Sequence, residues 1–238
     1  MNDERTDETQ FLRLLRMLHV ADSALPIGAT AHSFGLETLV AEGVLTVDQL
    51  DSYFRDYLLE AGALEATFCR ASHQLISSTT SDFPISRWLE LNQRLSALKP
   101  AREFRTGSSA LGRRFLQLAI GLNDWPLIET ALSSAQQNET DIHHCMAFGL
   151  VGAALGLTDQ TTALAYIHQS VAGLISACQR LLPLGQSQAG RMLWNLKPIM
   201  IESINGASID PDAVACFTPL LDLGSIRHPE LAVRLFIS

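Results

Sequence analysis

Apolar residues recur at helical spacing through most of this chain, and this pattern limits the folds open to it. The clearest series consists of Leu50, Tyr53, Phe54, Tyr57 and Leu58. It follows the i, i+3, i+4, i+7 rule of an amphipathic helix, and the same period returns within residues 104–122 and 164–178. No alternating Val, Ile, Thr and aromatic run is flanked by hairpin turns, which argues against sandwiches, barrels and βαβ sheets. The sequence therefore predicts an all-α fold.

Helix-breaking sequences divide the chain into segments of about 15 to 25 residues. The breakers lie at residues 82–84, 99–100, 123–126, 182–185 and 205–206. Thr46 and Gln49 match a capping box at the start of the helix that contains Leu50. Residues 149–156 are small and apolar, so we expect a neighbouring helix to pack closely against them, at the middle of the bundle. Together these features predict a single-domain bundle of roughly ten helices.

The ends of the chain differ from its centre. Residues 1–9 hold four acidic residues and one arginine, and we expect a solvated, mobile, acidic N-terminus. Residues 10–221 form the expected all-helical domain. Residues 222–238 are apolar and basic, which is typical of a segment that binds another protein, so we expect a partner-binding tail.

Composition narrows the class of protein further. The 238 residues are 47% hydrophobic, enough for a sizeable core, and 17 basic against 25 acidic residues give a net charge of −8. This charge disfavours nucleic acid and anionic membranes as main partners. The four cysteines form no C-x-x-C pair and no secretory leader is apparent. The longest stretch free of charged and strongly polar side chains, residues 145–157, is too short to cross a bilayer. We therefore expect a cytoplasmic protein without disulfides.

Motifs for common catalytic chemistry are missing from the sequence. There is no phosphate-binding P-loop, no dinucleotide-binding glycine pattern and no H-E-x-x-H motif, so we do not expect the chain to hydrolyse a nucleotide by itself. Residues 185–189 come within one residue of G-x-S-x-G, but that motif needs a preceding strand. We expect no catalytic residue and no cofactor. A hydrolase that uses Ser187 remains an alternative at this point.

Three consecutive residues, His143, His144 and Cys145, are candidate metal ligands because imidazole and thiolate bind soft divalent ions. Adjacent helical side chains point about 100° apart, so these three need ligands from elsewhere to share one ion. The simpler interpretation is that the histidines form hydrogen bonds at a helix start while the cysteine is buried. We therefore expect no dedicated metal site.

One stretch departs from the acidic average of the chain. Residues 87–114 carry seven basic residues against Glu90 and Glu103, and this basic belt could receive an acidic partner or a polyanion. Its basic members are Arg87, Arg94, Lys99, Arg102, Arg105, Arg113 and Arg114. A polyanion adaptor is therefore a second alternative, and a solvated helix face with ion pairs along it is equally compatible with the pattern.

Two further segments mix turn-forming and charged residues, which is typical of functional loops. Residues 21–37 are expected to form a Pro/Gly loop that enters a helix, with His32, Ser33 and Glu37 on or near one face. The other segment is the C-terminal run from Asp222 to Ser238. There Pro229 removes a backbone donor and disfavours helix at His228.

Taken together, these segments resemble the UreF family of urease accessory proteins. Four motifs carry the resemblance, in order along the chain: residues 22–28 running into 32–37, residues 102–105, residues 183–186 before Arg191, and Arg227-His228 with residues 234–238. The chain departs from the family pattern where Pro229 separates His228 from Glu230, and at Ala232-Val233 and Ile237.

The resemblance implies a helical, dimer-forming scaffold without catalytic residues. The resemblance further implies that this scaffold joins a UreD/UreH-type accessory protein and a UreG-type GTPase on apo-urease. It also implies that the scaffold regulates GTP hydrolysis, while the assembled complex handles nickel. The implied partner-binding residues are Pro26, Gly28, His32, Ser33, Gly35 and Glu37 near the start, and His228, Arg234, Leu235 and Phe236 in the tail. Secondary candidates are Arg102, Glu103, Arg105, Gly185 and Gln186.

Overall fold

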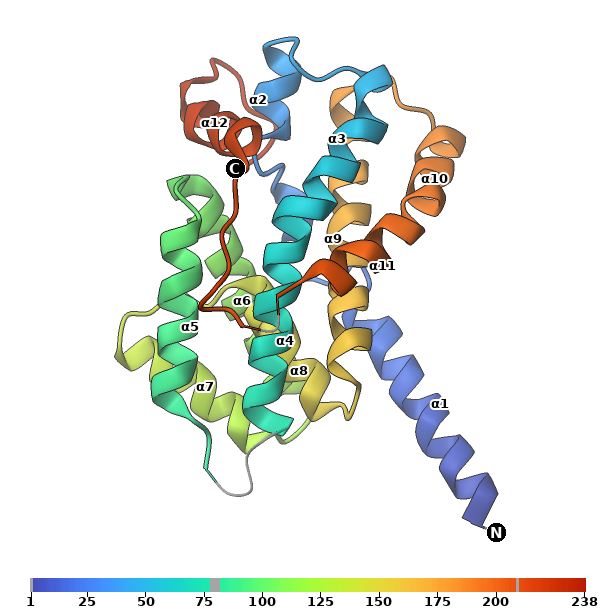
Figure 1. Cartoon of the computed structure of the whole chain (residues 1–238), viewed down its shortest axis with the longest axis vertical. Helices are drawn as coiled ribbons and strands as arrows, with labels where there is room; N and C mark the ends of the chain where they lie inside the picture. The colour runs from blue at the N-terminus through green and yellow to red at the C-terminus, as the bar shows by residue number, and fades with distance from the viewer. Residues whose placement is uncertain (1, 78–81, 209) are drawn as a thin grey trace.

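The computed structural model describes residues 2–77, 82–208 and 210–238, with side chains from residue 8 onward except at 77. These residues form helices and no strand, so the prediction of an all-α fold is confirmed (Figure 1). The first α-helices are α1 (Asn2–Val20), α2 (Leu36–Ala41), α3 (Leu50–Tyr57), α4 (Ala63–Ser77), α5 (Ile85–Leu98) and α6 (Arg102–Leu122). They are followed by α7 (Pro126–Gln137), α8 (His144–Ala154), α9 (Asp159–Leu181), α10 (Gln186–Asn195), α11 (Lys197–Gly206) and α12 (Pro219–Arg227). Short turns η1 (Ala29–Ala31), η2 (Val47–Gln49), η3 (Leu58–Gly62) and η4 (His228–Glu230) lie between or after them.

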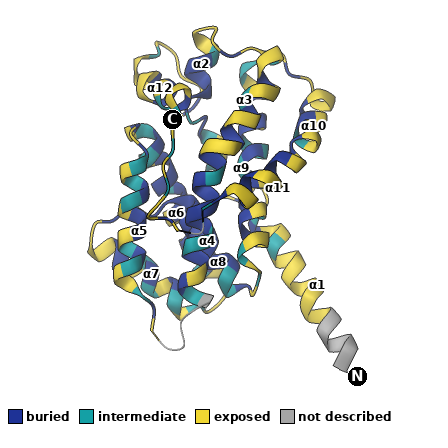
Figure 2. Ribbon diagram, viewed as in Figure 1, coloured by how far each residue is buried: buried dark blue, intermediate teal, exposed yellow. Residues whose placement is uncertain are grey.

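Helix α8 lies at the centre of the bundle, packed between α4, α6 and α9, as its small apolar residues predict (Figure 2). Gly149 lies so close to the backbone of Cys69 on α4 that a Cβ would collide with it, and Gly152 meets Thr162 on α9 in the same way. Close approach is therefore built into the sequence of α8. Among the described residues, no helix is both long enough and apolar enough to span a bilayer.

The helix predicted from Leu50 begins as expected. The backbone amide of Thr46 donates to the side-chain oxygen of Gln49 at 2.9 Å, completing the capping box. Leu50 and Phe54 are fully buried, and each such side chain stabilises the fold by about 1.5–3 kcal/mol. A π-turn, η3, then joins α3 to α4. Glu65, in the first turn of α4, is buried in the core.

Helix α1 projects from the bundle, and most of its described side chains are exposed (Figures 1 and 2). It begins at Asn2, so residues 2–9 of the acidic N-terminus are helical. The mobility expected for residues 1–9, like the boundaries at residues 10 and 222, stays a prediction.

The C-terminal part returns across the bundle after α11 and ends in α12, η4 and an irregular tail (Figure 1). The expectation that Pro229 disfavours helix at His228 is wrong. His228 has φ −53° and ψ −40°, and it continues α12 into the turn η4. The reason is tertiary, because both ring nitrogens of His228 are held by carboxylates of α2 and α6.

Candidate functional site

The loop before α2 has a backbone shape that requires particular residues. Gly35 has φ +90° and Phe34 has φ +50°, both in the left-handed region. This turn ends the loop, so α2 starts only at Leu36. The expectation that His32, Ser33 and Glu37 share a helix is therefore corrected: Glu37 lies on α2, whereas His32 and Ser33 lie in the loop before it.

Helix α12 packs against this turn at very short range. A Cβ on Gly35 would lie 2.8 Å from the backbone nitrogen of Ser225, and a Cβ on Gly224 would lie 2.8 Å from the carbonyl oxygen of Gly35. Two glycines therefore bring α12 directly onto the start of α2. This contact places the following residues, from His228 onward, beside Glu37.

Glu37 holds the tail through three hydrogen bonds. Its carboxylate accepts from the backbone amides of Leu235 at 2.5 Å and Phe236 at 3.1 Å. It also pairs with Nε2 of His228 at 2.9 Å. A single buried carboxylate on α2 thus fixes residues that follow it by almost the whole length of the chain.

Glu103 on α6 is the second carboxylate that binds the tail. Its carboxylate lies 2.7 Å from Nδ1 of His228 and 3.3 Å from Nη1 of Arg234. Since the two nitrogens of His228 face two different carboxylates, only the imidazolium form donates to both. We call Glu37, Glu103, His228 and residues 234–238 the tail-docking site.

The last residues of the tail lie against the loop before α2. The backbone amide of Ile237 donates to the carbonyl oxygen of Ala31 at 2.8 Å, and the hydroxyl of Ser238 lies 2.7 Å from Nδ1 of His32. Backbone amides of Ser33 and Phe34 both donate to the main-chain oxygen of Ser238. Ser238 belongs to the C-terminal motif but was not among the predicted partner-binding residues, because a single serine carries no signal of such a contact.

Phe236 is the buried anchor of the tail, with 4% of its surface exposed. The guanidinium of Arg180, on α9, lies over its ring at 4.1 Å and also donates to the carbonyl oxygen of Thr30 at 2.8 Å. Arg180 was also missed by the sequence analysis. Its only signal is that it is the single basic residue in the last turn of α9.

Electrostatics at this site favour a charged Glu37. Burial raises the pKa of Glu37, but the hydrogen bonds from Leu235, His228 and Phe236 outweigh burial and hold the pKa below its usual value. The pKa of His32 is lowered by burial and by the nearby Arg114, so His32 is neutral near pH 7. The loop therefore meets the tail as a neutral imidazole beside an ionised carboxylate.

The outer side of the docked tail is apolar. Val233, Leu235 and Ile237 have exposed fractions of 86%, 60% and 68%. Ile237 also lines a groove of about 820 Å³, together with Arg102, Glu103, Thr106, Arg114 and Ile226 among others. The inward side chains anchor the tail while the outward ones and this groove face solvent, which is the arrangement of a binding surface.

The remaining predicted partner-binding residues either lie away from the tail-docking site or contact other parts of the chain. Gly185 and Gln186 are exposed at the turn between α9 and α10, and no described contact joins them to the tail-docking site. Pro26 is exposed, while Gly28, at φ +85°, lies under the guanidinium of Arg114. Arg105 donates to the carbonyl oxygens of Lys99 and Pro100, at 2.6 and 2.7 Å.

The basic belt of residues 87–114 is not one continuous positive face. Arg87 pairs with Glu90 and Asp212, Arg94 donates to the carbonyl oxygen of Pro211, and Arg114 donates to that of Ile27. The ammonium of Lys99 is buried against Glu65 at 2.5 Å. Most basic residues of the belt therefore bind other parts of the same chain, whereas Arg102 and Arg113 are exposed.

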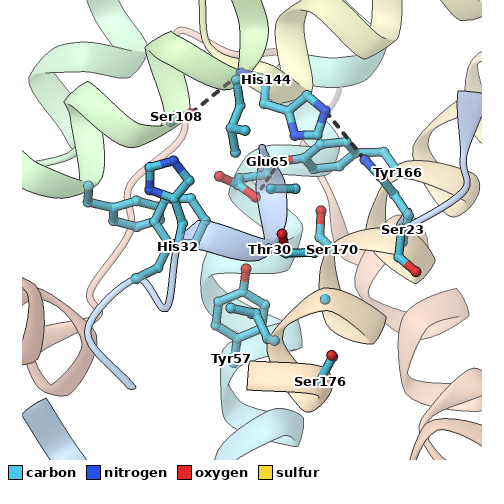
Figure 3. Close-up of a pocket in the computed structure, with 17 residues that line it drawn as sticks. Ser23, Thr30, His32, Tyr57, Glu65, Ser108, His144, Tyr166, Ser170 and Ser176 are labelled. Carbon is cyan, nitrogen blue, oxygen red and sulfur yellow. Dashed lines mark hydrogen bonds between the residues drawn. The ribbon is translucent and has the colours of Figure 1, made fainter. Parts of the chain in front are cut away.

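An interior pocket of about 90 Å³ lies behind the loop and reaches the centre of the bundle (Figure 3). Figure 3 shows His32 on one side of this pocket, with Glu65 and His144 further inside. Glu65 accepts from the hydroxyl of Tyr166 at 2.9 Å, and burial lowers the pKa of His144 to about 4. His32 lines both this pocket and the outer groove.

The candidate metal ligands are core residues. His143 pairs with hydroxyls of Ser96 at 2.8 Å and Ser108 at 3.1 Å, which fits the expected role of a histidine at a helix start. Cys145 is fully buried, which raises the pKa of its thiol. Among the described residues, no group of three or more His, Cys, Asp or Glu side chains is placed to hold a metal ion. Ser187 lies exposed in the first turn of α10.

Comparison with known proteins identifies the family. The UreF family model matches residues 44–197. A urease accessory protein UreF from a Bacillus species is 28% identical over 232 residues, covering 95% of this chain and 99% of the relative. Relatives of the same name from a Nostoc species and from Haemophilus influenzae are 32% identical over 228 residues and 30% identical over 225 residues. These alignments cover 94% and 93% of this chain, and 95% and 94% of the relatives.

The family match spans most of the helical core, and the alignment with the Bacillus relative covers 95% of the chain. The all-helical fold agrees with that match. The chain belongs to the UreF family of urease accessory proteins.

Proposed function

We propose that this chain is a non-catalytic scaffold of urease maturation in the cytoplasm. It bridges a UreD/UreH-type accessory protein and a UreG-type GTPase on apo-urease, so that the assembled complex inserts nickel. Family membership supports the role in urease maturation. The bridging, the homodimer and the control of GTP hydrolysis are parts of the proposal.

One observation carries the proposal: the tail is docked by its own chain and still exposes three apolar side chains. A free tail would lose conformational entropy on binding a partner, whereas a docked tail has lost most of it already. Val233, Leu235 and Ile237 therefore offer a preorganised apolar surface. This surface favours the scaffold hypothesis over an enzyme hypothesis, because the exposed side chains of the tail are apolar and carry no catalytic group.

The test is assembly of the full chain with the UreD/UreH-type and UreG-type proteins of the same organism, followed by size-exclusion chromatography with light scattering. Leu235→Asp puts a charge on the outward face and leaves the backbone amide that binds Glu37. Ile201→Asp, on α11, is the matched control because Ile201 is 51% exposed and lies outside the tail. The proposal predicts that only Leu235→Asp weakens the complex. A complex equally stable with both variants would contradict the role of the tail.

Control of GTP hydrolysis has two possible physical routes, an arginine finger and the positioning of the GTPase's own groups. Arg105 is engaged with the carbonyl oxygens of its own chain, which leaves Arg102 as the exposed candidate for a finger. We favour positioning. Arg102→Ala should then leave the GTPase rate of the assembled complex within about twofold, whereas loss of a finger lowers such rates by about 10³-fold or more.

A further inference from the structure

A second groove lies between α3 and the start of α12. It has a volume of about 290 Å³. Its apolar walls include Val44, Leu45, Phe217 and Leu220. The side chain of Phe217 is 78% exposed, whereas most phenylalanine side chains in folded proteins are buried. Apolar side chains on two separate segments thus face a common open space.

The rim of this groove is acidic. Asp56 and Glu60 are four residues apart along α3 and η3, both line the groove, and both are exposed. The lining contains no Lys, Arg or His, and neither carboxylate takes part in an ion pair within the described part of the chain. Two unpaired carboxylates beside apolar walls favour a cation that also carries apolar surface.

The groove also contains a polar group without a partner. The hydroxyl of Tyr53 is buried and makes no hydrogen bond in the described structure. Burial raises the pKa of Tyr53, so this hydroxyl keeps its proton and remains a potential donor. An unsatisfied buried hydroxyl is costly, but because this oxygen is shielded from solvent it is not counted among the groups that a ligand in the groove would meet.

We propose that this acidic groove binds a segment of a partner protein that carries a Lys or Arg next to an apolar side chain. A volume of about 290 Å³ lies at the lower end of the range for small-molecule sites and accommodates a few side chains rather than a whole cofactor. The acidic rim repels nucleic acids and acidic peptides. The inference rests on the proposed scaffold function, since it gives the scaffold a second contact surface apart from its tail.

The chemistry of the groove can be tested without any partner. Nuclear magnetic resonance spectra of the full-length chain are recorded with N-acetyl-leucyl-arginine amide and, as a matched control, with N-acetyl-leucyl-glutamate amide. We expect millimolar concentrations of the arginine peptide to shift the amide signals of Asp56, Glu60 and Phe217. The glutamate peptide should leave these signals unchanged, and the double variant Asp56→Lys/Glu60→Lys should abolish the response. No shift with the arginine peptide, or equal shifts with both peptides, would overturn the proposal.

The second experiment measures affinity for the assembly partners. The double variant Asp56→Lys/Glu60→Lys should weaken binding of one partner at least tenfold. Asp48→Lys/Asp51→Lys makes the same change of charge, more than two turns earlier, on residues that line a different groove with Arg191. This control should bind like the unaltered chain. Thermal unfolding of both variants checks that they remain folded, as expected for exposed positions.

The outcomes separate the two hypotheses. If the unaltered chain forms no complex, the scaffold function fails, and the peptide experiment alone decides the groove. If the complex forms and the groove variant binds every partner as tightly as the unaltered chain, the groove is not a partner contact and this inference is overturned. A loss confined to the groove variant would support it.

Discussion

The most direct test of the tail-docking site is the substitution Glu37→Gln. An amide has one accepting oxygen and one NH₂ group, so it cannot accept from three donors as the carboxylate does. If its oxygen keeps the contacts with His228 and Phe236, its NH₂ group faces the backbone amide of Leu235. One hydrogen bond is then lost and the bond from Phe236 changes from charge-assisted to neutral, while the imidazolium of His228 remains a charged donor.

The size of the effect follows from these contacts. A hydrogen bond to a charged group contributes about 1.5–3 kcal/mol, and a neutral one about 1 kcal/mol. The substitution should therefore weaken tail docking by about 3 kcal/mol. Since 1.4 kcal/mol corresponds to a tenfold change, the undocked population should rise about 100-fold. The global stability should change less, because most of the core lies outside the tail.

Amide hydrogen exchange measures this population directly. The amides of Leu235 and Phe236 exchange when the tail opens, so we expect them to exchange about 100-fold faster in Glu37→Gln. Glu42→Gln, at the opposite end of the same helix, is the matched control, because Glu42 pairs with Arg227 in an exposed ion pair that contributes at most about 1 kcal/mol. Exchange of the tail amides within threefold of the unaltered chain would refute the role of Glu37.

Three further predictions concern stability. Lys99→Met leaves the carboxylate of Glu65 buried without its cation and should lower the free energy of unfolding by about 3–5 kcal/mol in urea titrations, whereas adding Glu65→Gln should recover much of the loss. Gly35→Ala forces a Cβ against Ser225 at a positive φ and should destabilise the protein by at least about 1–3 kcal/mol, measured by thermal unfolding. Because the folded-state pKa of Glu37 is lowered, its contribution persists above the ordinary carboxyl pKa of about 4.3 and should be lost as pH falls through the lowered value, measured by exchange of the tail amides.

The helices were predictable because their signal is local. The series that starts at Leu50 buries one face of one helix, and the capping box at Thr46 involves residues three apart. The central position of α8 was also predictable, since only small residues such as Gly149 permit so close an approach. Local patterns of this kind need no knowledge of the rest of the fold.

The contacts of the tail-docking site could not be predicted in the same way. Leu235 and Glu37 are 198 residues apart, and no pattern along the chain pairs them. The left-handed turn at Phe34 is held partly by Ser238, so its shape depends on the far end of the chain. The resemblance to a family selected most of these residues as partner-binding candidates. The structure shows that several of them bind each other within the chain.

The charge count of residues 87–114 was misleading for a related reason. A local charge count includes only the acidic residues within the same stretch. It therefore overlooks acidic residues from elsewhere in the chain that pair with the basic ones. Lys99 instead pairs with Glu65 in the core, and Arg87 pairs with Asp212, which comes after α11. Such long-range ion pairs neutralise charges that the local count treats as unpaired.

The tail shows how one short segment serves both the fold and a binding surface. An extended chain directs successive side chains to opposite sides, so Phe236 and Ser238 face the bundle while Leu235 and Ile237 face solvent. Substitutions at the inward positions should therefore undock the tail and weaken partner binding together. Substitutions at the outward positions should weaken binding and leave the tail docked, because Leu235 contributes only its backbone amide to Glu37. Exchange of the tail amides, measured alongside partner affinity, distinguishes the two classes of residue within a segment of a few residues.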